Sequence, residues 1–448
     1  MSLAPENTTV KRALSVHAAI GLVAGALLYL VSLTGAVAVF YQEWQRIEQR
    51  DAPEMSSIEP AAVQRAVEAV MASEKGKPPT THLYVHLPVE PLPRTTITTD
   101  TQAVHIDASG NVAGPEEIAW SDFLVQLHYT LNLPAVLGLT IVGGLGVMML
   151  ALALSGVVAH PRIFRDAFRL RARDKGGVGL ADWHNRLSVW TLPFTLAIAF
   201  TGALIGMAYV TAFGVASTSY GGDLEAVYAP IFGAEGKPDE TPAPAPNVAA
   251  ALDYMRAHHP NADLTYVTLH DPGTAGQHIQ LLGEHKRRLI FGEYYTFDAD
   301  GRFHEIAGLA DGTLGQQAAA SNYRLHFGNF GGLPVKAAYF ILGLVLTAIC
   351  ATGTYIWLGK RERRGIDEPR MRALWDAVVW GSPLMLVLTF VLRQLVGNDA
   401  PLAIAFWAGM AVLLAVACFV TKRRALERGL KSALVVSLAA MPLMLWLA

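Results

Sequence analysis

The segment "VQLHYTLNLP" (125–134) places His128 six residues before Pro134, which begins a long apolar run. Nearly the same pattern returns at 323–334 as "YRLHFGNFGGLP", with His326 and Pro334 in corresponding places. One histidine beside an apolar run says little about function. Two such segments indicate an internal repeat, and this repeat organises the predicted fold.

The composition predicts a membrane protein that also carries some soluble mass. Of the 448 residues, 52% are hydrophobic and only 16% are charged. The net charge of −2 gives no basic excess for a nucleic-acid partner. The two cysteines lie in apolar runs, which excludes a disulfide framework, a CxxCH haem attachment and a four-cysteine iron–sulfur site. Any redox centre must therefore use other ligands, and the 14 histidines are the candidates.

Membrane-spanning segments need about 20 apolar residues in a helix. Seven runs meet or approach this length: about 18–41, 135–158, 186–211, 335–358, 375–396, 401–420 and 431–448. Basic residues cluster before the first run and after the second, fourth and sixth. The positive-inside rule then predicts a cytoplasmic N-terminus, an external C-terminus and two long external segments.

The two external segments, 42–127 and 212–325, carry matching signals. Each begins with a helical pattern, "SIEPAAVQRAVEAVMASEKG" in the first and "NVAAALDYMRAHHP" in the second, and continues with short strand-like runs. "HIDASGNV" and "TFDADGRF" share the Asp and Gly turn chemistry of β-hairpins. We therefore expect two small α+β domains outside the membrane.

The repeat also extends through the membrane. His17 and His184 each precede an apolar run, and a Thr-Gly pair begins 17 residues after each histidine. The second helices of the two copies end in "SGVVAHPR" and "TGTYIWLGKR". Residues 11–165 and 178–362 thus form two copies that run in the same direction, which predicts a pseudo-two-fold axis along the membrane normal.

The repeat pairs the histidines, His17 with His184 near the cytoplasmic face and His128 with His326 near the external face. Ionisable residues at membrane depth are costly and mark functional sites. Two imidazoles that meet across the axis can supply both axial ligands of a b-type haem. Four histidines in two equivalent pairs therefore predict two haem b groups, although a lone histidine at a helix end is more often an interfacial residue.

His160 is a fifth candidate, either in place of His17 or as a contact for a haem propionate. Its repeat equivalent is Trp357, so the symmetry argues against a ligand role. Zinc is a less favoured metal for these histidine pairs, because structural zinc sites prefer four ligands and often include cysteine. The glycines of the membrane helices fit close helix packing as well as close approach to a macrocycle.

These features together resemble the PepSY-associated transmembrane proteins, also called iron-regulated membrane proteins. The resemblance covers about residues 10–362 and rests on the paired "H…TG" helices, the external α/β segments, the "LHY/LHF…LP" segments and the "SG…HPR" ending. It implies PepSY-type external domains, haem ligation by His17, His184, His128 and His326, and a location in the bacterial inner membrane. It also implies a di-haem ferric-siderophore reductase that acts in the periplasm.

Reduction of iron(III) to iron(II) weakens its fit to hydroxamate or catecholate oxygens and favours release. Tyr129, Tyr323, Arg324 and Asn329 are candidates for contact with an anionic chelate. The sequence has no Rossmann-type G-x-G-x-x-G in a strand–helix context, so we expect electrons from a membrane quinol or a separate cytoplasmic reductase.

Other readings remain open at this point. The chain could be a haem-based conduit for another periplasmic redox partner, or a non-enzymatic membrane-anchored PepSY binding or regulatory protein. Transport is a lesser rival, because few acidic residues lie mid-membrane. The predicted segments are membrane helices 11–41, 128–160, 184–211 and 326–359, external domains 42–127 and 212–325, cytoplasmic loops 161–183 and 360–374, and a three-helix membrane extension 375–448.

Overall fold

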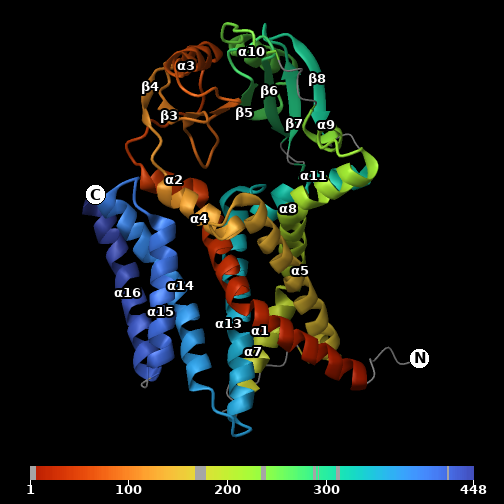
Figure 1. Cartoon of the computed structure of the whole chain (residues 1–448), viewed down its shortest axis with the longest axis vertical. Coiled ribbons are helices and arrows are strands. Elements are labelled where there is room, and N and C mark those ends of the chain that lie inside the picture. Colours follow the sequence, from red (N-terminus) through yellow and green to blue (C-terminus); the bar gives the residue numbers. More distant parts are fainter. Residues whose placement is uncertain are drawn as a thin grey trace. The chain divides into compact units, whose positions relative to one another are not determined.

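The computed structural model describes residues 7–166, 178–233, 239–285, 289–290, 292–308, 313–420 and 423–447. The chain forms two compact units (Figure 1). The membrane unit contains Met1–Tyr41, Ala119–Met207 and His326–Ala448, and the sheet unit contains Gln42–Ile118 and Ala208–Leu325. Much of the predicted basic loop 161–183 and part of the Pro/Ala stretch 237–246 lie outside the described residues.

Six helices of the described chain are long and apolar enough to cross a membrane. They are α1 (Asn7–Ala38), α5 (Ala135–Ala159), α8 (Leu192–Ser219), α13 (Gly332–Glu362), α14 (Pro369–Val396) and α15 (Leu402–Phe419). The seventh predicted span falls in α16 (Arg423–Leu447), which is a helix but is not among these six.

The remaining helices are shorter and connect or cover the main elements. They are α2 (Tyr41–Glu48), α3 (Pro60–Ser73), α4 (Ala119–Thr130), α6 (Ile163–Asp166), α7 (Val178–Trp190), α9 (Glu225–Phe232), α10 (Val248–His258), α11 (Leu314–Ala320) and α12 (Asn322–Phe327). The strands are β1 (His82–His86), β2 (Thr95–Thr98), β3 (Ala103–Ile106), β4 (Val112–Pro115), β5 (Ala262–His270), β6 (His278–His285), β7 (Glu293–Phe297) and β8 (Phe303–Gly308).

The two predicted external domains are the two halves of one antiparallel sheet of order β4-β3-β2-β1-β5-β6-β7-β8. The halves join at β1 and β5, where Leu83 lies opposite Leu269 and Val85 lies opposite Val267. These residues are fully buried in one core, which α3 and α10 also line. The pairing removes the edge that β1 and β5 would each present alone, with unpaired backbone amides and carbonyls.

His128 and His326, the pair predicted near the external face and here called the outer pair, lie on short helices of their own rather than at the start of the long apolar helices. His17 and His184 are the inner pair. His128 belongs to α4, and the chain then turns through Leu131 and Asn132, whose φ angles of 56° and 57° are left-handed. Gly138 permits this corner, because a Cβ there would lie 2.4 Å from the Thr130 carbonyl oxygen. His326 belongs to α12, which is followed by a left-handed glycine before α13 begins.

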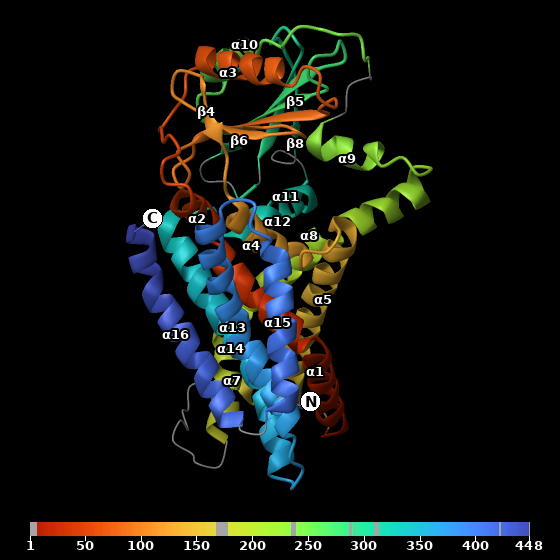
Figure 2. The ribbon, with the colours of Figure 1, turned by 60° about the vertical axis from the view of Figure 1, so that its left-hand side comes forward.

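The last three helices attach to the repeated part of the membrane unit through α14 and through a contact of α15 with α4, and α15 and α16 pack against α14 (Figure 2). Trp375 of α14 donates from Nε1 to the Ala351 carbonyl of α13 at 3.0 Å. The Tyr29 hydroxyl of α1 donates to the Val379 carbonyl of α14 at 2.7 Å. Because buried polar groups need partners, these bonds fix the position of α14 against α1 and α13.

Candidate cofactor-binding site

The four predicted histidines form two pairs, and all four lie in the membrane unit. The ring centroids of His17 and His184 are 6.4 Å apart, and the ring planes are nearly perpendicular at 84°. The ring centroids of His128 and His326 are 6.2 Å apart, and the planes differ by only 26°. Each pair takes one histidine from each sequence repeat, as the repeat predicts.

Each histidine is anchored by the other long helix of its own repeat. His326 illustrates the arrangement, since its Nδ1 lies 2.9 Å from the Thr201 hydroxyl and hydrogen-bonds to the Ile198 carbonyl of α8. Thr201 lies three residues after Ile198, so both groups face the same side of one helical turn. The residue after Thr201 is a glycine.

The same arrangement occurs at the other three histidines. Each Nδ1 has a backbone carbonyl as one partner and the hydroxyl three residues further on as the other, always in front of a glycine. The partners are Leu152 O at 3.0 Å and Ser155 Oγ at 3.3 Å for His17, Val31 O at 3.0 Å and Thr34 Oγ1 at 3.4 Å for His128, and Ile349 O and, at 2.9 Å, Thr352 Oγ1 for His184.

These partners determine which ring nitrogen carries the proton. The Thr201 hydroxyl donates its proton to the Ala197 carbonyl at 2.7 Å, as a threonine in a helix commonly does. The hydroxyls of Thr34, Ser155 and Thr352 likewise donate their protons to carbonyls of their own helices. Both neighbours of each Nδ1 are therefore acceptors, so each Nδ1 is protonated and donates. Each Nε2 then keeps a free lone pair, which is the form that binds a metal.

The glycine of each Ser/Thr-Gly dipeptide gives the imidazole room against the helix. A Cβ on Gly35 would lie 2.6 Å from His128 Cε1, and one on Gly202 would lie 3.0 Å from His326 Cε1. At the inner pair the corresponding distances are 3.4 Å from Gly156 to His17 Cε1 and 3.5 Å from Gly353 to His184 Cε1. The outer rings are therefore packed more tightly than the inner ones.

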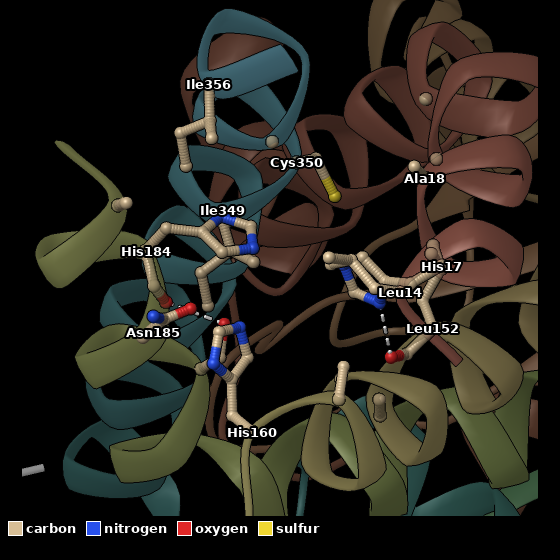
Figure 3. A pocket seen from close by; sticks show the side chains of 18 of the residues that line it. Leu14, His17, Ala18, Leu152, His160, His184, Asn185, Ile349, Cys350 and Ile356 are labelled. Carbon is tan, nitrogen blue, oxygen red and sulfur yellow. Dashed lines mark hydrogen bonds between the residues drawn. The ribbon is translucent and has the colours of Figure 1, made fainter. Parts of the chain in front are cut away.

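A cavity of about 340 Å³ lies at the inner pair. The rings of His17 and His184 extend toward one another from opposite sides of it, with His160 beside them (Figure 3). The remaining lining is largely apolar and includes Gly21 and Gly156. Its volume falls within the range of about 300–1,000 Å³ found for small-molecule and cofactor pockets.

The separation of the rings fits two ligands on opposite sides of one metal ion. A metal–imidazole bond is about 2.0–2.1 Å, and the ring centroid lies about 1.1 Å behind the nitrogen, so centroids about 6.3 Å apart are expected. Among the described residues, no group of three or more His, Cys, Asp or Glu side chains could hold a metal ion. Two nitrogen ligands alone suit a metal that brings its own remaining donors, as the iron of a haem does.

The two pairs lie far apart along the same helix. His17 is in the first half of α1, whereas Val31, Thr34 and Gly35, which hold His128, are near its end. At 1.5 Å per residue this offset is about 24 Å, most of the hydrocarbon thickness of about 30 Å. The sequence predicts one site near each membrane face, and a separation of this size is compatible with that prediction.

The other predicted site residues are divided between the two units. His160 lines the inner cavity as the residue that ends α5. Tyr129 and Asn329 lie in the membrane unit, whereas Tyr323 and Arg324 lie in the sheet unit. Arg324 forms an ion pair with Glu284 of β6. The boundary between the two units falls inside α12, which carries Tyr323 and Arg324 as well as His326, so the proposed chelate contacts remain a prediction.

Sequence reasoning missed the residues that hold the ligands. In the sequence analysis the Thr-Gly and Ser-Gly dipeptides only aligned the two repeats, and the glycines were left open between helix packing and close approach to a macrocycle. The signal that could have found them is their number, since each of the four histidines has one such dipeptide on the opposite helix of its repeat.

Comparisons with known proteins agree with this architecture. A family model described as the PepSY-associated TM region matches residues 14–360, more than three quarters of the chain, and the match includes all four paired histidines. A Pseudomonas aeruginosa protein, itself named uncharacterized protein PA4219, is 28% identical over 328 residues, which cover 65% of this chain and 79% of that protein. The chain is a member of the PepSY-associated transmembrane family.

Proposed function

We propose that the chain is a di-haem protein of the bacterial inner membrane that passes electrons to a ferric siderophore in the periplasm and so releases iron(II). The observation that carries the proposal is the pair of sites in which two imidazoles face each other at 6.2 and 6.4 Å. Each imidazole is fixed as the tautomer with a free Nε2.

A haem b bound in each site would supply reversible one-electron chemistry of its iron. His17 and His184 would hold one group, and His128 and His326 would hold the other, each through Nε2. The hydroxyls and carbonyls on Nδ1 fix the rotation of each ring and raise the basicity of the ligand. The largely apolar lining of the inner cavity suits the apolar faces of a macrocycle.

The substrate side of the proposal follows from the chemistry of iron. One electron converts iron(III) to iron(II), a softer ion for which hard hydroxamate or catecholate oxygens are poorer ligands. The electron comes from a membrane quinol or a cytoplasmic reductase. The positive-inside pattern predicts a cytoplasmic N-terminus and puts the two PepSY-like halves of the sheet in the periplasm in this proposal, where the chelate would be met.

Tyr129 and Asn329 in the membrane unit, and Tyr323 and Arg324 in the sheet unit, are the proposed chelate contacts. Arg324 is buried and paired with Glu284, whereas Asn329 is exposed and is therefore the residue to test first. A conduit to a different periplasmic redox partner would use the same haem sites. A non-enzymatic PepSY protein would need none of them.

The first test is the optical spectrum of the purified full chain, oxidised and dithionite-reduced, with pyridine haemochrome quantification. We expect two b-type haems per chain with low-spin bis-histidine bands. A ferric siderophore should then reoxidise the reduced protein directly. Reoxidation only by a protein partner would support the conduit, and a colourless chain that cannot be reconstituted with haem would overturn both redox functions.

A further inference from the structure

The two histidine pairs differ in one respect that the sequence repeat does not predict. The outer rings, His128 and His326, are close to parallel at 26°. The inner rings, His17 and His184, are close to perpendicular at 84°. Both pairs have nearly the same centroid separation, so the difference lies in the rotation of the rings and not in their spacing.

The rotation of each ring is fixed by its hydrogen bonds and by its contact with a glycine. An imidazole with a free Nδ1 could rotate about its χ2 torsion, which is broad for histidine. Here Nδ1 donates to two acceptors on one helical turn, and Cε1 lies over the glycine that follows the hydroxyl. Because the N–H bond lies in the plane of the ring, the acceptors on Nδ1 and the glycine against Cε1 together fix the rotation of the ring.

We propose that the Ser/Thr-Gly dipeptides are positioning residues that set the ring planes and thereby make the two haem sites electronically inequivalent. The proposal rests on the proposed function, because it concerns haem ligands. The dipeptides are Thr34-Gly35 and Thr201-Gly202 at the outer site, and Ser155-Gly156 and Thr352-Gly353 at the inner site. Hydrogen bonds to a ligand from its surroundings are an established means of tuning a metal.

The consequence follows from the symmetry of the iron d orbitals. Each imidazole interacts through its π system with the iron orbital perpendicular to the ring plane. Two parallel rings would act on the same iron d orbital and would strongly split the energies of the two d orbitals that interact with the ligands. The ferric low-spin signal would then be rhombic, with three resolved g values. Two perpendicular rings would act on different d orbitals, and their effects on the orbital splitting would nearly cancel. The signal would then be anisotropic and dominated by one large g value.

The test is electron paramagnetic resonance of the oxidised full chain, with haem content measured in the same sample. We expect two low-spin ferric signals of about equal integrated intensity, one of each type. Thr201→Val and Thr352→Val form a matched pair, because each removes a hydroxyl 2.9 Å from Nδ1 at equivalent positions of the repeat. Thr201→Val should alter only the rhombic signal, and Thr352→Val should alter only the large-g signal.

Thr201→Ser keeps the hydroxyl and should restore the wild-type spectrum, as the natural serine at 155 already serves His17. If Thr201→Val fails to accumulate, Thr34→Val tests the same site through His128. Two bound haems with signals of one type, or valine variants that leave both signals unchanged, would overturn this inference and leave the proposed function intact. Absence of haem would instead overturn the proposed function itself.

Discussion

Replacing Gly35 with alanine should displace the outer ligand His128 while leaving the inner site intact. Gly35 lies near the end of α1, directly against the imidazole that α4 presents. A Cβ at this position would lie 2.6 Å from Cε1, 3.1 Å from Nδ1 and 3.3 Å from Nε2 of that ring. The methyl group therefore meets the whole edge of the ligand rather than one flexible tip.

The magnitude follows from these distances. Carbon atoms pack at about 3.5–4.0 Å, so the His128 ring would have to move by about 0.9 Å. Overpacking of this kind costs about 1–3 kcal/mol, and loss of the groups that orient a metal ligand typically costs about 10–100-fold in affinity. A displacement of that size is close to half the length of a metal–nitrogen bond of about 2 Å, so one haem should be lost or become high-spin.

Gly156→Ala is the matched control at the inner site. Its Cβ would lie 3.4 Å from His17 Cε1, which the ring accommodates with a small shift. Helical alanine also gains about 0.5–1 kcal/mol over glycine, so the control should fold at least as well.

The assay is pyridine haemochrome quantification per chain, with the ferrous spectrum recorded on the same samples. We expect about one low-spin haem in Gly35→Ala and two in Gly156→Ala, with Gly202→Ala, at 3.0 Å from His326, between them. If Gly35→Ala keeps two low-spin haems, or if Gly156→Ala loses as much haem as Gly35→Ala, the reasoning from the glycine contacts is refuted.

Three further outcomes are expected. His184→Gln should lose one haem per chain, whereas His160→Gln should keep two; equal losses in the haemochrome assay would make His160 a ligand. Gly143→Ala places a Cβ 2.8 Å from backbone of α8 and should lower the melting temperature in detergent, whereas Gly144→Ala, with no neighbour within 4 Å, should not; equal melting temperatures would contradict the close packing of α5 and α8. Burial lowers the pKa of His105 in the sheet unit to about 4, against about 6.5 in the unfolded chain. The unfolded state therefore binds the proton first as the pH falls. The free energy of unfolding of β3 should fall by about 2 kcal/mol between pH 7.5 and pH 5.0. Hydrogen exchange of β3, corrected for intrinsic rates, should show this loss of stability in the wild type but not in His105→Gln. A wild-type β3 whose stability does not change with pH would refute the prediction.

The sequence by itself determined the features that depend on local pattern. Apolar runs of membrane length predicted six helices that the structure contains, because a helix that satisfies its own backbone is what such a run must form in lipid. The repeat then paired His17 with His184 and His128 with His326, because equivalent residues of two copies face each other across a shared axis. The seventh predicted run also forms a helix, α16, although this helix is not among the six of the described chain that are long and apolar enough to span a membrane.

Tertiary structure decided the features that depend on distant residues meeting. No local pattern in either external segment shows that β1 pairs with β5, because the pairing joins residues that lie 180 to 188 positions apart in the chain, from His86 with Tyr266 to His82 with His270. The hydroxyl, carbonyl and glycine that hold each histidine come from another helix, and the sequence shows the dipeptides without showing what they touch. The tautomer, the tightness of each glycine contact and the angle between the rings follow from packing, so the same repeated sequence produces one nearly parallel pair and one nearly perpendicular pair.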